Sequence, residues 1–444
     1  MPREMGLREN RLMKNATFAA DPGVIGVLRD QMARGELSPE ALLERSLARI
    51  EVAEPLVKGW RIVDHAGARE QAATLGSSPA RGLLHGIPVA VKDVIDVAGF
   101  PTRAGSRSRE NVSPARADAT IVTRLRAAGA VIVGKANTTE FAFFDGPPPT
   151  RNPHDLSRTP GGSSAGPAAV VAAGMVPLAL GTQTAGSISR PAAYCGIAAF
   201  KPSTLSWPTF GVVPFAPSLD TVGIFSYRVA DASAAARVLM PDFVSPGRPS
   251  LGQIRIAMID DPILTDASAG VAKLMDAISA RLTAGGIASE TVGAPVSLAK
   301  LNDLHLTVRE YEVGHAHADL LGTEDGLITP ALRDAIGRGL AIDDRLYIDA
   351  ISALAAARTA FWSAIAAFDA LIFPAAPDTA PVGMATGPAH FIVPFTALGG
   401  PIVSIPCGID QGMPLGVMVV AAPGADRLLL DIAERIAPVI EMPR

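Results

Sequence analysis

Serine side chains and one lysine, in three separate segments, have the types and surroundings needed for nucleophilic chemistry. The segment "GTQTAGSISRPAAYCG" (181–196) places Ser187 among small residues directly after an apolar run. Small neighbours let backbone N–H groups approach a substrate carbonyl, which suits a nucleophilic serine beside an oxyanion hole. The same composition is typical of an ordinary strand-to-helix turn, so the spacing alone leaves both interpretations open.

A second serine motif, "PGGSSAG" (160–166), satisfies the loose pattern G-x-S-x-G through Gly162, Ser164 and Gly166. That pattern marks the nucleophile elbow of α/β-hydrolases only where a strand comes directly before it. The preceding residues, "TRNPHDLSRTP", contain prolines and polar side chains and cannot form a central strand. The motif taken alone therefore indicates a flexible loop.

Lys92 interrupts the β-branched run of "GIPVAVKDVIDVAG" (86–99), which predicts a strand. Lysine is seldom buried without a purpose, and burial lowers its pKa, which makes the neutral amine available as a base. The alternative is a lysine on an edge strand that faces solvent or pairs with Asp93.

Metal, nucleotide and other cofactor chemistry is not expected. His315 and His317 lie two residues apart in a helical segment, so they point to different faces and make a poor metal pair. The chain has neither a phosphate-binding G-x-x-x-x-G-K-[ST] loop nor a dinucleotide fingerprint.

Composition indicates a protein with a large core and without a nucleic-acid or membrane surface. Hydrophobic residues make up 48% of the 444 residues, and the formal net charge is −4 without a long run of like charges. This balance disfavours nucleic-acid and anionic-membrane partners. Two cysteines exclude a disulfide framework, the first residues lack the apolar stretch of a signal peptide, and the most apolar run (168–181) is too short to span a bilayer. We expect a cytoplasmic protein.

Helix-then-strand patterns predict a mostly parallel sheet covered by helices on both faces. Such patterns occur at 118–142 and 164–184, and the stretch 262–362 is Ala-rich and helical. Near the end, the chain supplies further strands at 368–377, 400–408 and 414–422, and a last amphipathic helix at 424–437. Because both halves of the chain supply strands, we expect one domain (21–444) after a flexible segment (1–20).

Taken together, "GGSSAG", "GTQTAGSISRPAAYCGIAAFKPS" and the lysine strand resemble the amidase signature family of serine hydrolases. The likeness extends over nearly the whole chain from about residue 22 and is poorest at 262–362. It implies an α/β fold, a three-layer α/β/α sandwich around a large mixed β-sheet, with 262–362 as a variable region near the substrate pocket.

The resemblance also implies a Ser–cisSer–Lys triad. Ser187 matches the nucleophile, Ser163 the bridging serine that follows a cis peptide, and Lys92 the base. A hydroxyl can accept a proton and donate its own, so Ser163 could relay the proton of Ser187 to neutral Lys92. Ser164 matches a hydroxyl that orients the lysine. The segment that matches the oxyanion hole is Thr184, Ala185, Gly186 and Ser187.

The chain departs from the family pattern around the nucleophile. Gln183 stands where most members carry aspartate, and Ala165 and Ala185 replace common glycines. Ser189 occupies the usual arginine position and Arg190 follows it. These changes spare the triad, and we expect a rearranged ion pair that involves Arg190.

An aromatic segment precedes the proline-rich "GPPPT". Phe141, Phe143 and Phe144 could line an apolar entrance for substrate or pack in the core. The sequence leaves both interpretations open.

The expected function is hydrolysis of a neutral, fairly apolar amide, anilide, aryl ester or carbamate by a monomer or homodimer. A neutral substrate is favoured because the sequence shows no dedicated cationic clamp. One alternative is the glutaminase subunit of a tRNA-dependent amidotransferase, which the changed aspartate and arginine positions and the short chain disfavour. The other is a catalytically silent ligand-binding homologue, which the retained triad disfavours.

Overall fold

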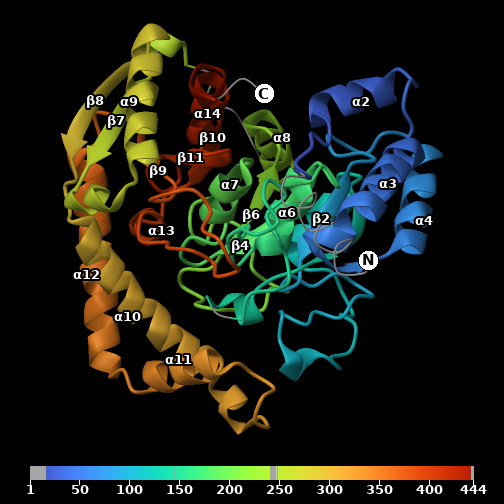
Figure 1. Cartoon of the computed structure of the whole chain (residues 1–444), viewed down its shortest axis with the longest axis horizontal. Coiled ribbons are helices and arrows are strands. Elements are labelled where there is room, and N and C mark those ends of the chain that lie inside the picture. Colours follow the sequence, from blue (N-terminus) through green and yellow to red (C-terminus); the bar gives the residue numbers. More distant parts are fainter. Residues whose placement is uncertain (1–16, 145, 241–246, 248, 442–444) are drawn as a thin grey trace, which may run out of the picture.

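A single mixed sheet runs through the molecule, which was analysed as a computed structural model that describes residues 17–144, 146–240, 247 and 249–441 (Figure 1). Its eleven strands lie in the order β1-β3-β2-β4-β6-β5-β10-β11-β9-β7-β8. The strands are β1 (Trp60–Val63), β2 (Pro88–Lys92), β3 (Val131–Ala136), β4 (Leu178–Gln183), β5 (Ala198–Lys201), β6 (Thr221–Ser226), β7 (Arg255–Asp260), β8 (Ala288–Gly293), β9 (Ala370–Pro374), β10 (Ile402–Asp410) and β11 (Met413–Val420).

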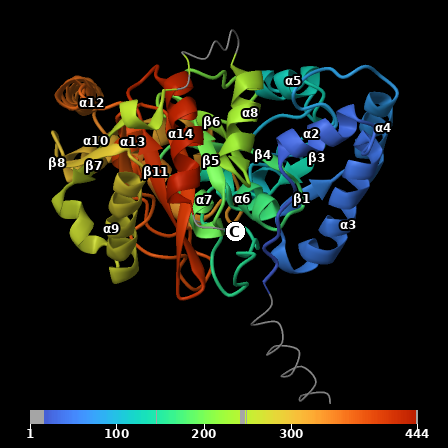
Figure 2. The same ribbon diagram turned by 90° about the horizontal axis from the view of Figure 1, so that it is seen from above.

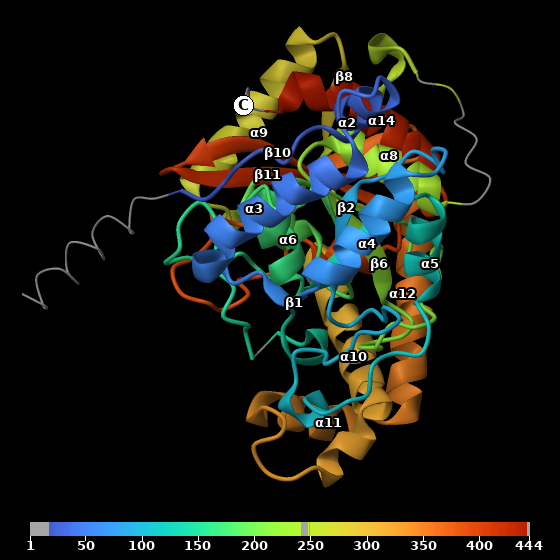
Figure 3. The same cartoon turned by 90° about the vertical axis from the view of Figure 1, so that its right-hand side faces the viewer.

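Helices cover both faces of this sheet. In Figure 2, α3 and α4 lie at one end of the molecule and α9 and α12 at the other. The helices are α2 (Ile25–Ala33), α3 (Pro39–Val57), α4 (His65–Gly76), α5 (Thr120–Ala127), α6 (Ala165–Ala172), α7 (Ser189–Cys195), α8 (Val229–Leu239), α9 (Ala269–Ala284), α10 (Leu298–Ala316), α11 (Pro330–Leu340), α12 (Asp344–Ala364), α13 (Val393–Ala397) and α14 (Asp426–Ile440). Figures 1 and 3 show α11 far from the sheet, at the lower end of α10.

Alternation along the central strands separates two cores. On β2, Val89 and Val91 pack in the cluster that contains residues of α2, α5, α8 and α14. Ala90 points the other way, into the cluster formed with α3, α4, α6 and α7. Because β2 is paired with parallel strands β3 and β4 on its two sides, all five of its residues are buried. The predicted α/β sandwich with a mixed sheet is confirmed.

The predicted helix–strand units are confirmed, but the expectation of a mostly parallel sheet is wrong, because six of the ten strand pairings among the described residues are antiparallel. Two further expectations are corrected. The strand expected at 86–99 ends at Lys92, and turns follow it. The stretch 262–362 is not wholly helical, since it contains β8 at the edge of the sheet. The β8 sequence "ASETVG" lacks apolar alternation because no residue of this strand is buried.

The expected flexible segment 1–20 is also corrected in part. Residues 1–16 lie outside the described residues. The N–H of Phe18 donates to Pro153 O (2.6 Å) and that of Ala20 donates to Ala172 O (2.9 Å), so the end of this segment is held on the fold. Among the helices that the structure describes, none combines the length and apolar character needed to cross a bilayer.

Candidate active site

Lys92 lies at the C-terminal end of β2, inside the molecule. Its Nζ atom is 2.7 Å from Ser163 Oγ and 2.7 Å from Thr182 Oγ1, on the neighbouring strand β4. The alternative of an edge lysine is wrong, because β2 is an inner strand and Lys92 is completely buried. The alternative partner Asp93 instead pairs with Lys135, at 3.0 Å.

Burial favours the neutral form of this lysine. Desolvation lowers the pKa of Lys92 well below its ordinary value, and the negative charge of Asp220 opposes this shift only in part. A neutral amine has a lone pair, so Lys92 can accept a proton from the serine hydroxyl beside it.

The peptide bond between Gly162 and Ser163 is cis, as the resemblance implied. Arg190, buried on α7, donates hydrogen bonds to the carbonyl oxygens of Gly162 and Gly387. Burial lowers the pKa of Arg190 to about 10. Gly161 has φ +81°, and a Cβ there would lie 2.9 Å from Pro191 Cα. The loop with Ser163 is therefore fixed tightly to α7, the helix that follows Ser187.

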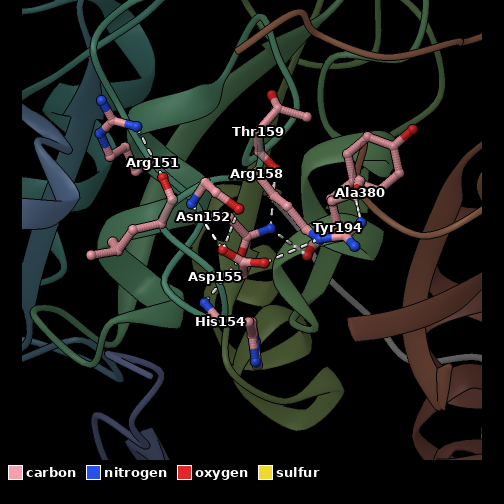
Figure 4. Close-up of polar contacts among 10 residues, drawn as sticks. Arg151, Asn152, His154, Asp155, Arg158, Thr159, Tyr194 and Ala380 are labelled. Atoms are coloured by element: carbon pink, nitrogen blue, oxygen red, sulfur yellow. Dashed lines mark hydrogen bonds and ion pairs between the residues drawn. The ribbon is translucent and has the colours of Figure 1, made fainter. Parts of the chain in front are cut away.

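The approach to this loop is held by side chains that reach across it (Figure 4). Asn152 Nδ2 donates to the carbonyl oxygens of Thr159 (3.1 Å) and Tyr194 (2.8 Å). Arg158 donates to Ala380 O at 2.6 Å. Residues 151–162 form no strand before the motif, so the α/β-hydrolase elbow is rejected, and these contacts hold in place a segment that the sequence alone indicated as a flexible loop.

Ser187 lies in the turn between β4 and α7, and only 6% of its surface is exposed. Two carbonyl groups of this turn contact side chains from distant parts of the chain. The Nε2 atom of His305 lies 2.8 Å from Thr184 O, and Thr396 Oγ1 donates to Ala185 O at 2.5 Å. With its carbonyls held by these neighbours, the turn leaves its amide hydrogens available.

Those amide hydrogens have no partner within the part of the chain that the structure describes. This holds for the backbone N–H groups of Ala185, Gly186 and Ser187. Unpaired N–H groups beside a nucleophile are what an oxyanion requires, because they stabilise charge that develops only during the reaction. The geometry fits the predicted oxyanion segment.

Gln183 fastens both ends of the turn. Its Oε1 accepts from the N–H groups of Ile188 (2.8 Å) and Ser189 (2.9 Å), and its Nε2 donates to Thr396 Oγ1 (2.9 Å). The expected rearranged ion pair is wrong: Arg190 bonds carbonyl groups and forms no ion pair with a carboxylate of the described residues. A neutral amide has taken over the place of the family's aspartate.

Asp220 supports the turn from another side. Its carboxylate accepts a hydrogen bond from Thr184 Oγ1 and from the N–H groups of Phe215 (2.7 Å) and Ala216 (3.2 Å). Burial raises the pKa of Asp220 to about 6, against these hydrogen bonds. Asp220 therefore contacts the turn through Thr184 and acts electrostatically on Lys92.

Ser164 acts on the lysine through Thr182. Ser164 Oγ donates to Thr182 O (3.1 Å) and accepts from Thr182 N (3.3 Å), whereas the Thr182 hydroxyl itself touches Lys92. Sequence reasoning did not assign roles to Thr182, Asp220, His305 or Thr396. Of these, only Thr182 had a sequence signal, since it lies in the strand that leads to Ser187.

The three phenylalanines differ in their surroundings. Phe141 packs against His317 with ring centroids 4.9 Å apart, and Phe143 packs against Phe215 at 6.0 Å. Both are buried members of the main core. Phe144 is only half-buried and carries the guanidinium of Arg309 over its ring at 4.6 Å. Core packing accounts for Phe141 and Phe143, whereas Phe144 stays a candidate for substrate contact.

One link of the predicted relay is formed and one is not. Lys92 contacts Ser163, but the hydroxyl of Ser187 makes no hydrogen bond to Ser163 or another described residue. Catalytic hydrogen bonds are often long without substrate and shorten when it binds. No group of three or more His, Cys, Asp or Glu side chains that could hold a metal is found among the described residues.

The site thus combines a buried lysine, hydrogen-bonded to a serine that follows a cis peptide, with a second serine in a turn whose amide groups are unpaired among the described residues. The family model described as Amidase matches residues 41–430, and the chain belongs to this family of hydrolases that act on C–N bonds.

Relatives and solved structures agree with this assignment. The chain is 34% identical over 456 aligned residues to a glutamyl-tRNA(Gln) amidotransferase subunit from Symbiobacterium thermophilum, with 90% of this chain and 93% of that protein covered. It is similar to the crystal structure of an amidase (TM-score 0.83, 30% identity, 93% and 98% coverage). It is also similar to the native peptide amidase from Stenotrophomonas maltophilia (TM-score 0.82, 27% identity, 94% and 97% coverage).

Proposed function

We propose that the protein hydrolyses a linear amide through an acyl-enzyme, with Ser187 as nucleophile, Ser163 as proton relay and Lys92 as base. The observation that carries this proposal is the fully buried Lys92 amine, 2.7 Å from Ser163 Oγ. Burial favours the neutral form of this amine, and a neutral amine within hydrogen-bond distance of a hydroxyl can accept its proton.

The chemistry follows from the positions of these groups. Ser187 Oγ attacks the substrate carbonyl while its proton passes to Ser163, whose own proton passes to Lys92. The carbonyl oxygen becomes an oxyanion that accepts from the free N–H groups of the turn. Lys92 then returns the proton through Ser163 to the leaving nitrogen, and water hydrolyses the ester formed on Ser187.

The bond attacked could belong to an amide, anilide, aryl ester or carbamate, since one acyl-transfer site attacks each of these carbonyls. A fairly apolar substrate is supported by the ring of Phe144 and by Phe215, which lines a small cavity together with Thr182 and Thr184. The expectation of a neutral substrate depends on the lack of a cationic clamp, and the guanidinium of Arg309 over Phe144 removes that argument. We further propose that the protein is cytoplasmic and is a monomer or homodimer. Light scattering after size-exclusion chromatography would measure its oligomeric state.

The test compares Ser187→Ala with Ser233→Ala, which changes a fully buried serine on α8, far from the lysine in the sequence. We expect Ser187→Ala to lose at least 10³-fold in kcat/KM on a panel of amides, anilides, aryl esters and carbamates, because the nucleophile is gone. Ser233→Ala should keep the parent activity. Hydrolysis by Ser187→Ala at the parent rate would overturn the proposal.

A second candidate is a glutaminase component of a tRNA-dependent amidotransferase. The similarity to the amidotransferase protein of Symbiobacterium thermophilum favours it. The short chain no longer counts against it, because the alignment covers 93% of that protein. Release of ammonia from L-glutamine, increased by co-purifying partner proteins, would support this candidate over a free-standing amidase. A silent ligand-binding homologue would bind ligand yet fail to react at Ser187 with a fluorophosphonate.

A further inference from the structure

One face of α10 is turned toward the nucleophile turn. His305 contacts Thr184 O, and Glu312, seven residues later, accepts from the N–H of Ser218 at 2.9 Å. Residues at spacings of four and three share a helix face, so Arg309 lies between these two contacts on the same side. The side chain of Arg309 is therefore directed toward the catalytic side of α10.

The ring of Phe144 gives a second, independent placement of Arg309. The guanidinium lies 4.6 Å over that ring. The carbonyl of Phe144 accepts from Thr386 Oγ1 (3.4 Å), and a Cβ on Gly162 would lie only 2.6 Å from the Thr386 methyl carbon. Arg309 is thus connected through two side chains to the cis peptide that positions Ser163.

The guanidinium of Arg309 is mostly buried and has no hydrogen-bond acceptor among the described residues. Its side chain is 13% exposed and makes no hydrogen bond to a residue that the structure describes. The carboxylate of Glu310 is 3.9 Å away and lies closer, at 3.1 Å, to Arg338. A guanidinium has five N–H donors in a flat fork that matches a carboxylate, and these donors are available here.

We propose that Arg309 binds a carboxylate on the acyl part of the substrate, so that the substrates are monoamides of dicarboxylic acids. This inference rests on the proposed amide hydrolysis and names the substrate class of the same site. The buried carboxylates of Asp220 and Glu312 already accept hydrogen bonds from N–H and hydroxyl groups. That arrangement favours an acid without a neighbouring ammonium group over an amino acid such as glutamine.

The experiment measures ammonia release from the monoamides of succinic, glutaric and adipic acid, each paired with its neutral diamide. The full chain is compared with Arg309→Met, which keeps packing on Phe144, with Arg309→Lys, which keeps the charge, and with Arg345→Met, an exposed arginine on α12. We expect at least one monoamide to exceed its diamide by 10-fold or more in kcat/KM.

Arg309→Met should lose about 10- to 100-fold on that monoamide and less than 3-fold on the diamide, because hydrogen bonds to a charged group are lost. Arg309→Lys should fall between the two, and Arg345→Met should match the parent. L-Glutamine should be a poorer substrate than the glutaric monoamide. Equal rates on monoamide and diamide, or an equal loss on both in Arg309→Met, would overturn the proposal.

Protection of Ser187 separates this proposal from the proposed function. The free diacids should slow fluorophosphonate labelling of Ser187 in the parent and in Arg345→Met but not in Arg309→Met. Protection without hydrolysis of any amide would leave the carboxylate site standing and refute amide hydrolysis. Hydrolysis of diamides without protection by any diacid would refute the carboxylate site alone.

Discussion

Replacing Gln183 with leucine should disable the nucleophile turn without touching a reacting group. The substitution leaves the buried N–H groups of Ile188 and Ser189 without the acceptor that now holds them at 2.8 and 2.9 Å. An unsatisfied buried donor costs about 1–3 kcal/mol, so the two together should lower the free energy of unfolding by about 2–6 kcal/mol. A turn that shifts its N–H groups should also react about 10²-fold more slowly.

Gln71→Leu is the matched control for this prediction. Gln71 Oε1, on α4, also accepts two hydrogen bonds, one from Ile132 N of β3 (3.1 Å) and one from Arg126 of α5 (2.7 Å). Urea unfolding and the labelling rate of Ser187 by a fluorophosphonate should be measured on both variants. Both should lose stability, but only Gln183→Leu should lose reactivity. An unchanged labelling rate in Gln183→Leu, or an equal decrease in Gln71→Leu, would refute the reasoning.

Three further predictions concern the groups around the lysine and the turn. Because burial lowers the pKa of Lys92 and the neutral amine is the proposed base, kcat/KM should rise from acidic to mildly alkaline pH and level off below the ordinary pKa of a lysine. A flat pH profile, with acylation shown to be rate-limiting, would contradict Lys92 as the base. Thr182→Val should decrease kcat by about 3- to 10-fold and lower the midpoint of the pH profile, because the hydroxyl that accepts a hydrogen bond from Lys92 Nζ is lost. Thr182→Ser should restore both kcat and the midpoint. An unchanged midpoint in Thr182→Val would show a merely structural role. Burial lowers the pKa of His305 to about 3, so between pH 6.5 and 3 the unfolded chain binds more protons than the folded chain, and the free energy of unfolding decreases as the pH falls through that window. In urea unfolding, His305→Gln should therefore lose less free energy of unfolding between pH 7 and pH 5 than the parent. An equal loss in both would argue against a neutral, buried His305 as the source of this pH dependence.

Local patterns predicted the central strands and singled out Lys92 and Ser187 as candidates. Lys92 stands out because a charged residue interrupts an apolar strand, and Ser187 because small residues surround it after one. Both signals arise within a few neighbouring residues, where period and composition reflect burial directly. The helix–strand units that carry them were predictable for the same reason.

The supporting contacts depend on residues far apart in the chain. Thr396 reaches Gln183 and Ala185 across more than 200 positions, and His305 reaches Thr184 across 121. Nothing in their own neighbourhoods distinguishes these side chains from ordinary helix residues. The sequence predicts an ion pair beside Gln183 for this reason, because Thr396 on α13, the neutral side chain that Gln183 contacts, can be found only from the fold.

The most direct test of the central claim is the site and rate of fluorophosphonate modification in the parent, Lys92→Met and Ser163→Ala, read by intact and peptide mass spectrometry. The proton relay predicts a single adduct on Ser187 in the parent and a labelling rate at least 10²-fold lower in each variant, with the fold preserved by circular dichroism. An adduct on another residue, or labelling of Ser187 at the parent rate in Ser163→Ala, would contradict it.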